Sequence, residues 1–128
     1  KKYTGQIPGG LKPGQALFFQ GVVPSDCHRF SINLKTGPKD HDDIALHFDN
    51  RITYVVCNSF RNGKWETESN TNWCPFAKGA AFDVFMVALQ YIMVNNIYFL
   101  NSLLLESHGT HVLCCSLFVN SILMISYI

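Results

Sequence analysis

The sequence predicts an all-β protein, built of many short antiparallel strands in a sandwich or a barrel. Turn-forming residues recur at short intervals, and the segments between them are rich in β-branched and aromatic residues. No segment combines a long helical hydrophobic period with helix-capping residues, so we expect little helix. The strongest hairpin signal is Asn62-Gly63, because a tight primed turn needs a positive φ at both central positions. The expected strands cover residues 15–22, 29–34, 44–49, 53–59, 64–68, 81–89 and 92–100.

Two of these segments, 29–34 and 44–49, alternate apolar and polar residues as a half-buried strand does. The apolar residues predicted to face the core are Phe30, Ile32, Leu34, Ile44, Leu46 and Phe48. The polar residues predicted to face the other way are Arg29, Ser31, Asn33, His47 and Asp49. Neighbouring polar rows of this kind can line a groove.

Length and charge restrict the class of protein. The 128 residues fit one domain over residues 1–128, which is long enough to bury a core without metals or disulfides. The formal net charge is +1, so the composition implies no field for nucleic acid or for an acidic substrate. The first residues hold no apolar signal segment, and polar residues interrupt the apolar stretches after Ala81. We therefore expect no transmembrane segment.

The cysteines indicate free thiols rather than a metal centre. Their number is odd, no Cys-x-x-Cys pair occurs, and no cluster has the spacing of zinc ligands. They are Cys27, Cys57, Cys74, Cys114 and Cys115. Residues 39–43 are acidic but lack the glycine and the spaced ligands of a calcium loop, so we expect a solvated turn. No metal and no cofactor are expected.

Six residues on consecutive expected strands have the chemistry that a sugar site requires: His47, Asp49, Arg51, Asn58, Trp65 and Glu68. A sugar has one apolar face of C–H groups and a rim of hydroxyls that both donate and accept. Trp65 can supply a flat aromatic plate for that face, and Arg51 supplies rigid planar donors. Glu68 can orient Arg51 and accept a hydrogen bond from a hydroxyl.

These residues belong to three pieces that resemble the galectin carbohydrate-recognition motif. The pieces are His47-Phe48-Asp49-Asn50-Arg51, Val56-Cys57-Asn58 and Trp65-Glu66-Thr67-Glu68-Ser69-Asn70. The galectin patterns are His-x-Asn-Pro-Arg, Val-x-Asn and Trp-x-x-Glu-x-Arg. The resemblance extends to the opening Ile7-Pro8-Gly9-Gly10 and, more loosely, to Val94-Asn95-Asn96 and the ending Ile125-Ser126-Tyr127-Ile128.

The resemblance implies a two-sheet antiparallel β-sandwich, the galectin or concanavalin-like jelly roll, with a galactose site on its concave sheet. The ligands it implies are β-galactosides such as lactose or N-acetyllactosamine, carried on glycans and glycoproteins. By position, His47 and Arg51 would hold the 4-hydroxyl of galactose, Asn58 and Glu68 would hold the 6-hydroxyl, and Trp65 would stack under the ring. The polar row of Arg29, Ser31 and Asn33 would widen the groove for longer glycans.

Three positions depart from the galectin pattern. Asp49 replaces an Asn, so it accepts but cannot donate, and it would compete with Glu68 for Arg51. Asn50 replaces a Pro, and Asn70 replaces the second Arg. The loop after Arg51 is also short. On these grounds Asp49→Asn is expected to raise lactose affinity.

Two other functions compete with the lectin. The first is a galectin-fold protein with lost or altered sugar binding that acts through protein–protein contacts. The second is a sandwich-fold glycosidase with Asp49 and Glu68 as its carboxylate pair. Hydrolysis needs a carboxyl with a raised pKa, whereas Arg51 would keep both groups ionised, so no enzyme activity is expected.

The second half of the chain is unusually apolar, with Asp83 and Glu106 as its two formal charges after residue 80. One explanation is a homodimer, formed through terminal strands such as the one ending at Ile128, that covers an outer sheet face. The other is that this part is atypical of the family. Cys114 and Cys115 would point to opposite faces of one strand. Galectins are made in the cytosol and leave without a signal peptide, so both a cytoplasmic and an extracellular location are implied.

Overall fold

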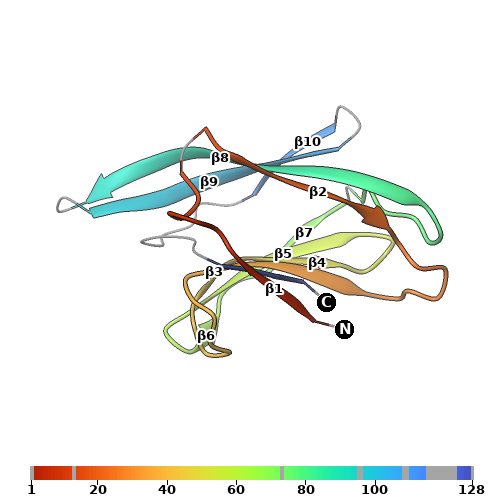
Figure 1. The fold of residues 1–128 in the computed structure, drawn as a ribbon, viewed down its shortest axis with the longest axis horizontal. Coiled ribbons are helices and arrows are strands. Elements are labelled where there is room, and N and C mark those ends of the chain that lie inside the picture. The colour runs from red at the N-terminus through yellow and green to blue at the C-terminus, as the bar shows by residue number, and fades with distance from the viewer. Residues whose placement is uncertain are drawn as a thin grey trace.

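The computed structural model describes residues 2–12, 14–72, 74–94, 97–107, 110–114 and 124–127. All regular structure in these residues is β-strand, arranged as two antiparallel sheets in two layers (Figure 1). The predicted all-β, two-sheet sandwich is thereby confirmed. Because the described residues contain no helix, they contain none that is long and apolar enough to cross a membrane.

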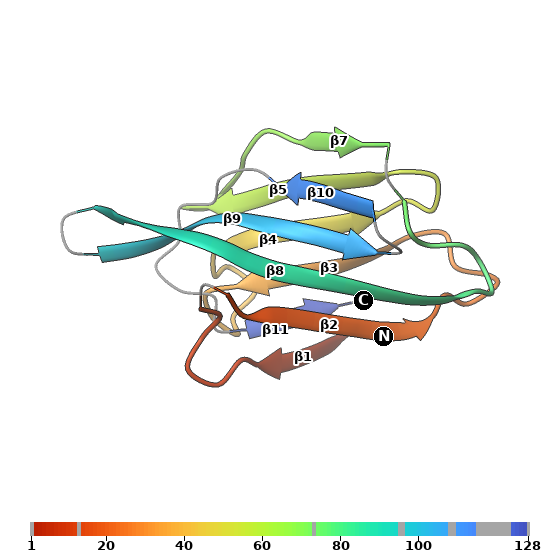
Figure 2. The ribbon, with the colours of Figure 1, turned by 90° about the horizontal axis from the view of Figure 1, so that it is seen from above.

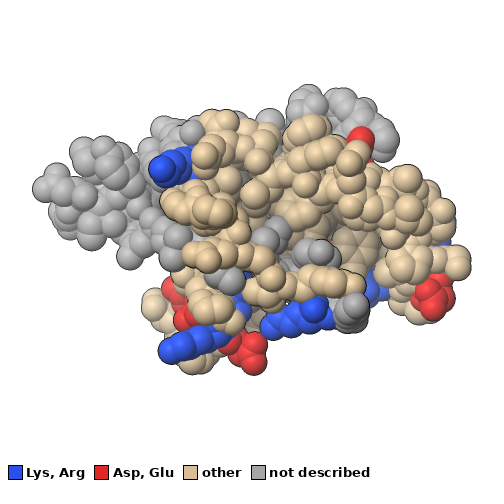
Figure 3. All heavy atoms as spheres, in the orientation of Figure 1, with Lys and Arg blue, Asp and Glu red and all other residues tan. Residues whose placement is uncertain are grey.

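The larger sheet has seven strands. Six of them follow the order β1 (Tyr3–Gln6), β11 (Met124–Tyr127), β3 (Phe30–Lys35), β4 (Ile44–Asn50), β5 (Val55–Arg61) and β6 (Lys64–Trp65). The seventh, β7 (Ser69–Thr71), pairs with β5 beside β6. On the face seen in Figure 3, Lys and Arg side chains gather mainly on the lower part, over this sheet.

The smaller sheet has four strands and lies across the first (Figure 2). Its order is β10 (Thr110–Cys114), β9 (Ile97–Ser107), β8 (Ala81–Val94) and β2 (Ala16–Val22). The prediction of one strand over residues 92–100 is wrong, because β8 ends at Val94 and β9 begins at Ile97 as its antiparallel partner. Asn95 and Asn96 lie outside the described residues, as do Cys115 and Ile128.

The core lies between the sheets and confirms most of the predicted alternation. Ile32, Leu34, Leu46 and Phe48 are buried, and each such side chain stabilises the fold by about 2 kcal/mol. Phe30 is half-buried and packs on this core. The prediction that Ile44 faces the core is wrong. The strand register shifts between Ile44 and His47, so the neighbouring Ala45 is buried in its place.

The predicted Asn62-Gly63 hairpin is confirmed, with φ of 54° and 77° at its two central residues. The strand expected over 64–68 is nevertheless divided. β5 pairs with β6 at Phe60 and Trp65 and with β7 at Cys57 and Ser69, so residues 58–59 on β5 face residues 66–68 on the other side. This one-residue bulge interrupts the strand and changes which side chains reach the outer face of the sheet.

The two chain ends meet in the larger sheet. β11 pairs with β1 on one side and with β3 on the other, so β1 forms the sheet edge (Figure 2). A dimer through the C-terminal strand itself would have to displace one of these pairings, whereas β1 offers an edge.

Candidate functional site

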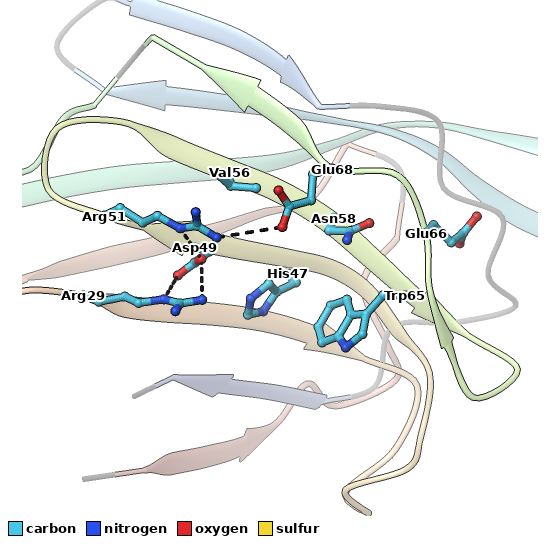
Figure 4. A pocket seen from close by; sticks show the side chains of 9 residues that line it. All are labelled: Arg29, His47, Asp49, Arg51, Val56, Asn58, Trp65, Glu66 and Glu68. Carbon is cyan, nitrogen blue, oxygen red and sulfur yellow. Dashed lines mark hydrogen bonds and ion pairs between the residues drawn. The ribbon is translucent and has the colours of Figure 1, made fainter.

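The described residues form a pocket on the larger sheet, on the side that faces away from the core (Figure 4). Its volume of about 440 Å³ suits a small ligand. Nine residues line it: Arg29, His47, Asp49, Arg51, Val56, Asn58, Trp65, Glu66 and Glu68. Seven of the ten residues predicted as site residues are among them.

Strand register brings these side chains together. His47 on β4 pairs with Asn58 on β5, and Asp49 pairs with Val56, so all four point to the same face. Arg29 directly precedes β3, and Arg51 directly follows β4. Trp65 ends β6 and is followed by the bulge that carries Glu66 and Glu68.

Asp49 lies at the centre of a charge network. Arg29 donates to both of its carboxylate oxygens, from Nε to Oδ1 and from Nη2 to Oδ2, each at 2.8 Å. Arg51 donates a third hydrogen bond from Nε to Oδ2, at 3.0 Å. Burial alone would raise the pKa of Asp49, but the hydrogen bonds from the two arginines outweigh it and hold the pKa below its usual value.

Arg51 is held from three sides. Its Nη1 donates to the Tyr54 hydroxyl at 3.3 Å, its Nε donates to Asp49, and its Nη2 lies 3.8 Å from Glu68 Oε1. The hydrogen bonds to Tyr54 and to Asp49 raise the pKa of Arg51. In the predicted competition for Arg51, Asp49 therefore holds the closer contact and Glu68 the looser one.

His47 and Trp65 form the aromatic part of the pocket. Their ring centroids are 4.9 Å apart, and Phe60 supports Trp65 from 5.2 Å, which leaves Trp65 53% exposed. His47 Nδ1 donates to Asn33 Oδ1 at 2.5 Å, because an amide oxygen can only accept. In the neutral ring, the other nitrogen, Nε2, is then an acceptor. Burial lowers the pKa of His47 and favours this neutral form.

The loop after β4 is short, as predicted, and Asn50 closes it. Asn50 is fully buried, and its Oδ1 accepts a hydrogen bond from the backbone N–H of Ile52 at 3.0 Å. The N–H of Arg51 donates to the carbonyl of Tyr54 at 3.0 Å. Thus a side-chain hydrogen bond replaces the restraint that a proline would impose just before Arg51. The Asn50 amide nitrogen has no hydrogen-bond partner among the described residues.

Glu66 and Val56 are pocket residues that the sequence analysis missed. Glu66 is bound by Arg61, whose Nη2 donates at 2.6 Å, and by the Ser59 hydroxyl at 2.8 Å. The hydrogen bond from Arg61 lowers the pKa of Glu66. Regular alternation would point Glu66 away from Trp65, so only the bulge explains its place. The place of Val56 could have been predicted from the sequence, because Val56 lies two residues from Asn58 and therefore points to the same face of the strand.

Three predicted site residues lie beside the pocket without lining it. Asn33 is nearly buried and acts on the pocket through His47. Ser31 pairs with Asp49 across the strands, and Asn70 on β7 pairs with Val56. Within the part of the chain that the structure describes, no group of three or more His, Cys, Asp or Glu side chains is placed to hold a metal ion.

Comparison with known proteins identifies the family. The family model described as galactoside-binding lectin matches residues 2–101. The chain is 41% identical to galectin-4 of Bos taurus over 96 residues, which are 72% of this chain and 29% of that protein. It is 36% identical to galectin-7 of Homo sapiens over 88 residues, 67% of this chain and 65% of that protein. The matched part thus spans less than two thirds of either relative.

Solved structures share the fold. Sheep galectin-11, in complex with glycerol, has 17% sequence identity and a TM-score of 0.81, covering 98% of this chain and 87% of that one. The toad ovary galectin in complex with thio-digalactose has 23% identity and a TM-score of 0.79, covering 98% and 90%. The chain belongs to the galactoside-binding lectins, the galectins.

Proposed function

We propose that this chain binds β-galactosides, such as lactose or N-acetyllactosamine, in the pocket of the larger sheet and does no chemistry on them. The observation that carries the proposal is the convergence of Trp65, His47, Arg51 and Glu68 on one pocket. They combine an exposed aromatic plate, an acceptor nitrogen, a fixed set of donors and a carboxylate.

His47 and Arg51 together suit a single hydroxyl. A sugar hydroxyl can donate to His47 Nε2 and accept from the guanidinium of Arg51 at the same time. In the family motif these positions hold the axial 4-hydroxyl of galactose. Trp65 is exposed enough to stack on the apolar face of the same ring, because His47 and Phe60 contact it and leave its remaining surface open.

Arg51 and Glu68 suit a second hydroxyl. The 3.8 Å between Arg51 Nη2 and Glu68 Oε1 is too long for a good hydrogen bond. A sugar hydroxyl placed between them would accept from Arg51 and donate to Glu68, so that both charged groups gain a partner.

The same charges argue against hydrolysis. A glycosidase needs a carboxyl that stays protonated near neutral pH. Asp49 is buried under two arginines that lower its pKa, so it cannot serve as that acid. Binding without catalysis is therefore the function that this arrangement favours.

One observation favours the alternative of protein–protein contacts. Phe18 and Phe85 stack with ring centroids 4.5 Å apart on the outer face of the smaller sheet, where they are 48% and 42% exposed. Exposed apolar side chains of this size are typical of interaction surfaces. A homodimer, glycoprotein partners, and a location in the cytosol, outside the cell or both stay predictions for this chain.

The test is a lactose titration by calorimetry, with Trp65→Ala and with Phe85→Ala as a matched aromatic control. We expect saturable binding with Kd of about 1 mM or tighter, corresponding to roughly 4 kcal/mol or more. Trp65→Ala should abolish it, while Phe85→Ala, on the other sheet, should retain it. The absence of binding by the unsubstituted chain at high lactose would overturn the proposal.

A further inference from the structure

Asp49 is the unusual feature of the pocket, and its environment is not that of a ligand contact. Its side chain is 2% exposed, whereas those of Arg29 and Arg51 are 61% and 33% exposed. The carboxylate therefore lies beneath the two guanidinium groups and presents almost no surface to a ligand. Figure 4 shows it between Arg29 and Arg51, with His47 next along the pocket.

We propose that Asp49 is a positioning residue that makes this pocket selective for neutral galactosides over anionic ones. It holds Arg29 and Arg51 side by side and compensates the positive charge that they would otherwise present to a ligand. This inference rests on the proposed function, since it concerns the substrate class of the same site.

The positioning role follows from the hydrogen bonds. Asp49 accepts from Nε and Nη2 of Arg29 and from Nε of Arg51, which fixes the planes of both guanidinium groups. Two like charges this close would repel each other without the carboxylate between them. Among the described residues, Asp49 is the hydrogen-bond partner that holds Arg29, and the Arg29 side chain is largely exposed, so without the carboxylate it would turn into solvent. Arg51 would keep Tyr54 alone as a hydrogen-bond partner on that side.

The selectivity follows from the charge balance. The two positive charges of Arg29 and Arg51 are balanced by the negative charges of Asp49 and Glu68. The negative charge of Glu66 is balanced by the positive charge of Arg61. A sulfate or carboxylate on a sugar would give up its hydration and gain no net attraction from such a balanced set of charges. Hydroxyl groups need only donors and acceptors, which the pocket supplies.

This geometry reverses the expectation drawn from sequence for Asp49→Asn. An asparagine here would add no donor that the sugar can reach, because the position is covered. The substitution would instead leave Glu68 as the single negative charge opposite the two positive charges of Arg29 and Arg51. The pocket would therefore become positively charged and less ordered. We expect weaker lactose binding and a relative gain for anionic galactosides.

The experiment compares the calorimetric affinities of lactose and of lactose sulfated on its galactose, at one low ionic strength. Asp49→Asn should lower lactose affinity about tenfold. It should also raise the ratio of sulfated-lactose to lactose affinity about fivefold. Arg29→Met, at an exposed side chain that folding tolerates, should shift that ratio in the opposite direction. Lys12→Met, which removes an exposed cation away from the pocket, should leave both affinities unchanged.

A spectroscopic readout separates positioning from simple destabilisation. The Nε–H groups of Arg29 and Arg51 should give slowly exchanging NMR signals in the unsubstituted protein, and both should be lost in Asp49→Asn while the backbone spectrum is kept. If the chain binds lactose and neither Asp49→Asn nor Arg29→Met moves the affinity ratio, the inference is wrong. If the chain does not bind lactose at all, the proposed function fails and the inference fails with it.

Discussion

At the scale of single residues, His47 shows how a neighbour decides what a side chain can do. The sequence places a histidine at this point of the motif, but only the contact of Nδ1 with Asn33 determines that Nε2 accepts. A protonated His47 would donate from both nitrogens and could no longer accept from a hydroxyl there.

We expect His47 to make lactose binding depend on pH. Burial, together with the nearby charges of Arg29 and Arg51, lowers the pKa of His47 from the usual 6.5. Asp49 and Glu68 act in the opposite direction but do not outweigh burial, so the neutral form persists to a more acidic pH. We expect lactose affinity to be flat above 6.5, the ordinary pKa, and to fall as the pH drops through the lowered pKa. The unfolded state binds the proton more readily, so fold stability should also decline below 6.5.

The measurement is calorimetry of lactose binding at a series of pH values, with histidine NMR signals followed in parallel. Affinity that rises on acidification would contradict the assigned acceptor role of His47.

The site residues could be predicted from sequence where order and spacing identify the motif, and not where distant side chains meet. His47, Arg51, Trp65 and Glu68 occur in the family's order, and the structure places all four around one pocket, while their role in binding stays a prediction. That Arg29 reaches Asp49 depends on the pairing of β3 with β4, and the accompanying burial of Asp49 has no signature in composition or alternation.

At the scale of elements, the sequence predicted most strands correctly but not where they end. Local pattern identifies a strand, whereas its end depends on how far its partner continues. β5 therefore runs on to Arg61 beside β6, and β8 runs on to Val94 beside β9. The bulge opposite Asn58 and Ser59 was likewise invisible, because it arises from a mismatch between two strands.

The Asn62-Gly63 turn that precedes Trp65 gives an element-scale prediction. Gly63 has φ of 77°, and a Cβ built there would meet nothing within 4 Å. Gly63→Ala should therefore lower the free energy of unfolding by about 1–2 kcal/mol through backbone strain alone. Urea denaturation measures this change in the free energy of unfolding. Lys64→Ala is the neighbouring control, at an exposed residue without a positive φ. If the two variants were equally stable, the positive φ assigned to Gly63 would be contradicted.

At the scale of the whole molecule, the two sheets present opposite faces of different chemistry. The charged pocket lies on the larger sheet, and the described outer side chains of the smaller sheet include Phe18, Val22 and Phe85. This division explains the uneven charge along the sequence, since the second half of the chain supplies β8, β9 and β10 of the smaller sheet. It also predicts that association and sugar binding can be changed separately.

We expect the chain to self-associate through its apolar surface, and the double variant Phe18→Ser, Phe85→Ser to weaken that association. Each exposed phenyl ring that a second copy covers would leave water, and burying a Phe side chain is worth about 1.5–3 kcal/mol. Removing both should weaken association at least about tenfold.

Sedimentation equilibrium over a concentration series measures the strength of self-association, with Trp65→Ala as the matched aromatic control on the opposite sheet. Since the pocket and this face lie on different sheets, the double variant should keep the lactose affinity of each chain. An unsubstituted chain that stays at 14.5 kDa at every concentration would rule out the dimer. Self-association that the double variant leaves unchanged would instead direct attention to β1, the edge of the larger sheet.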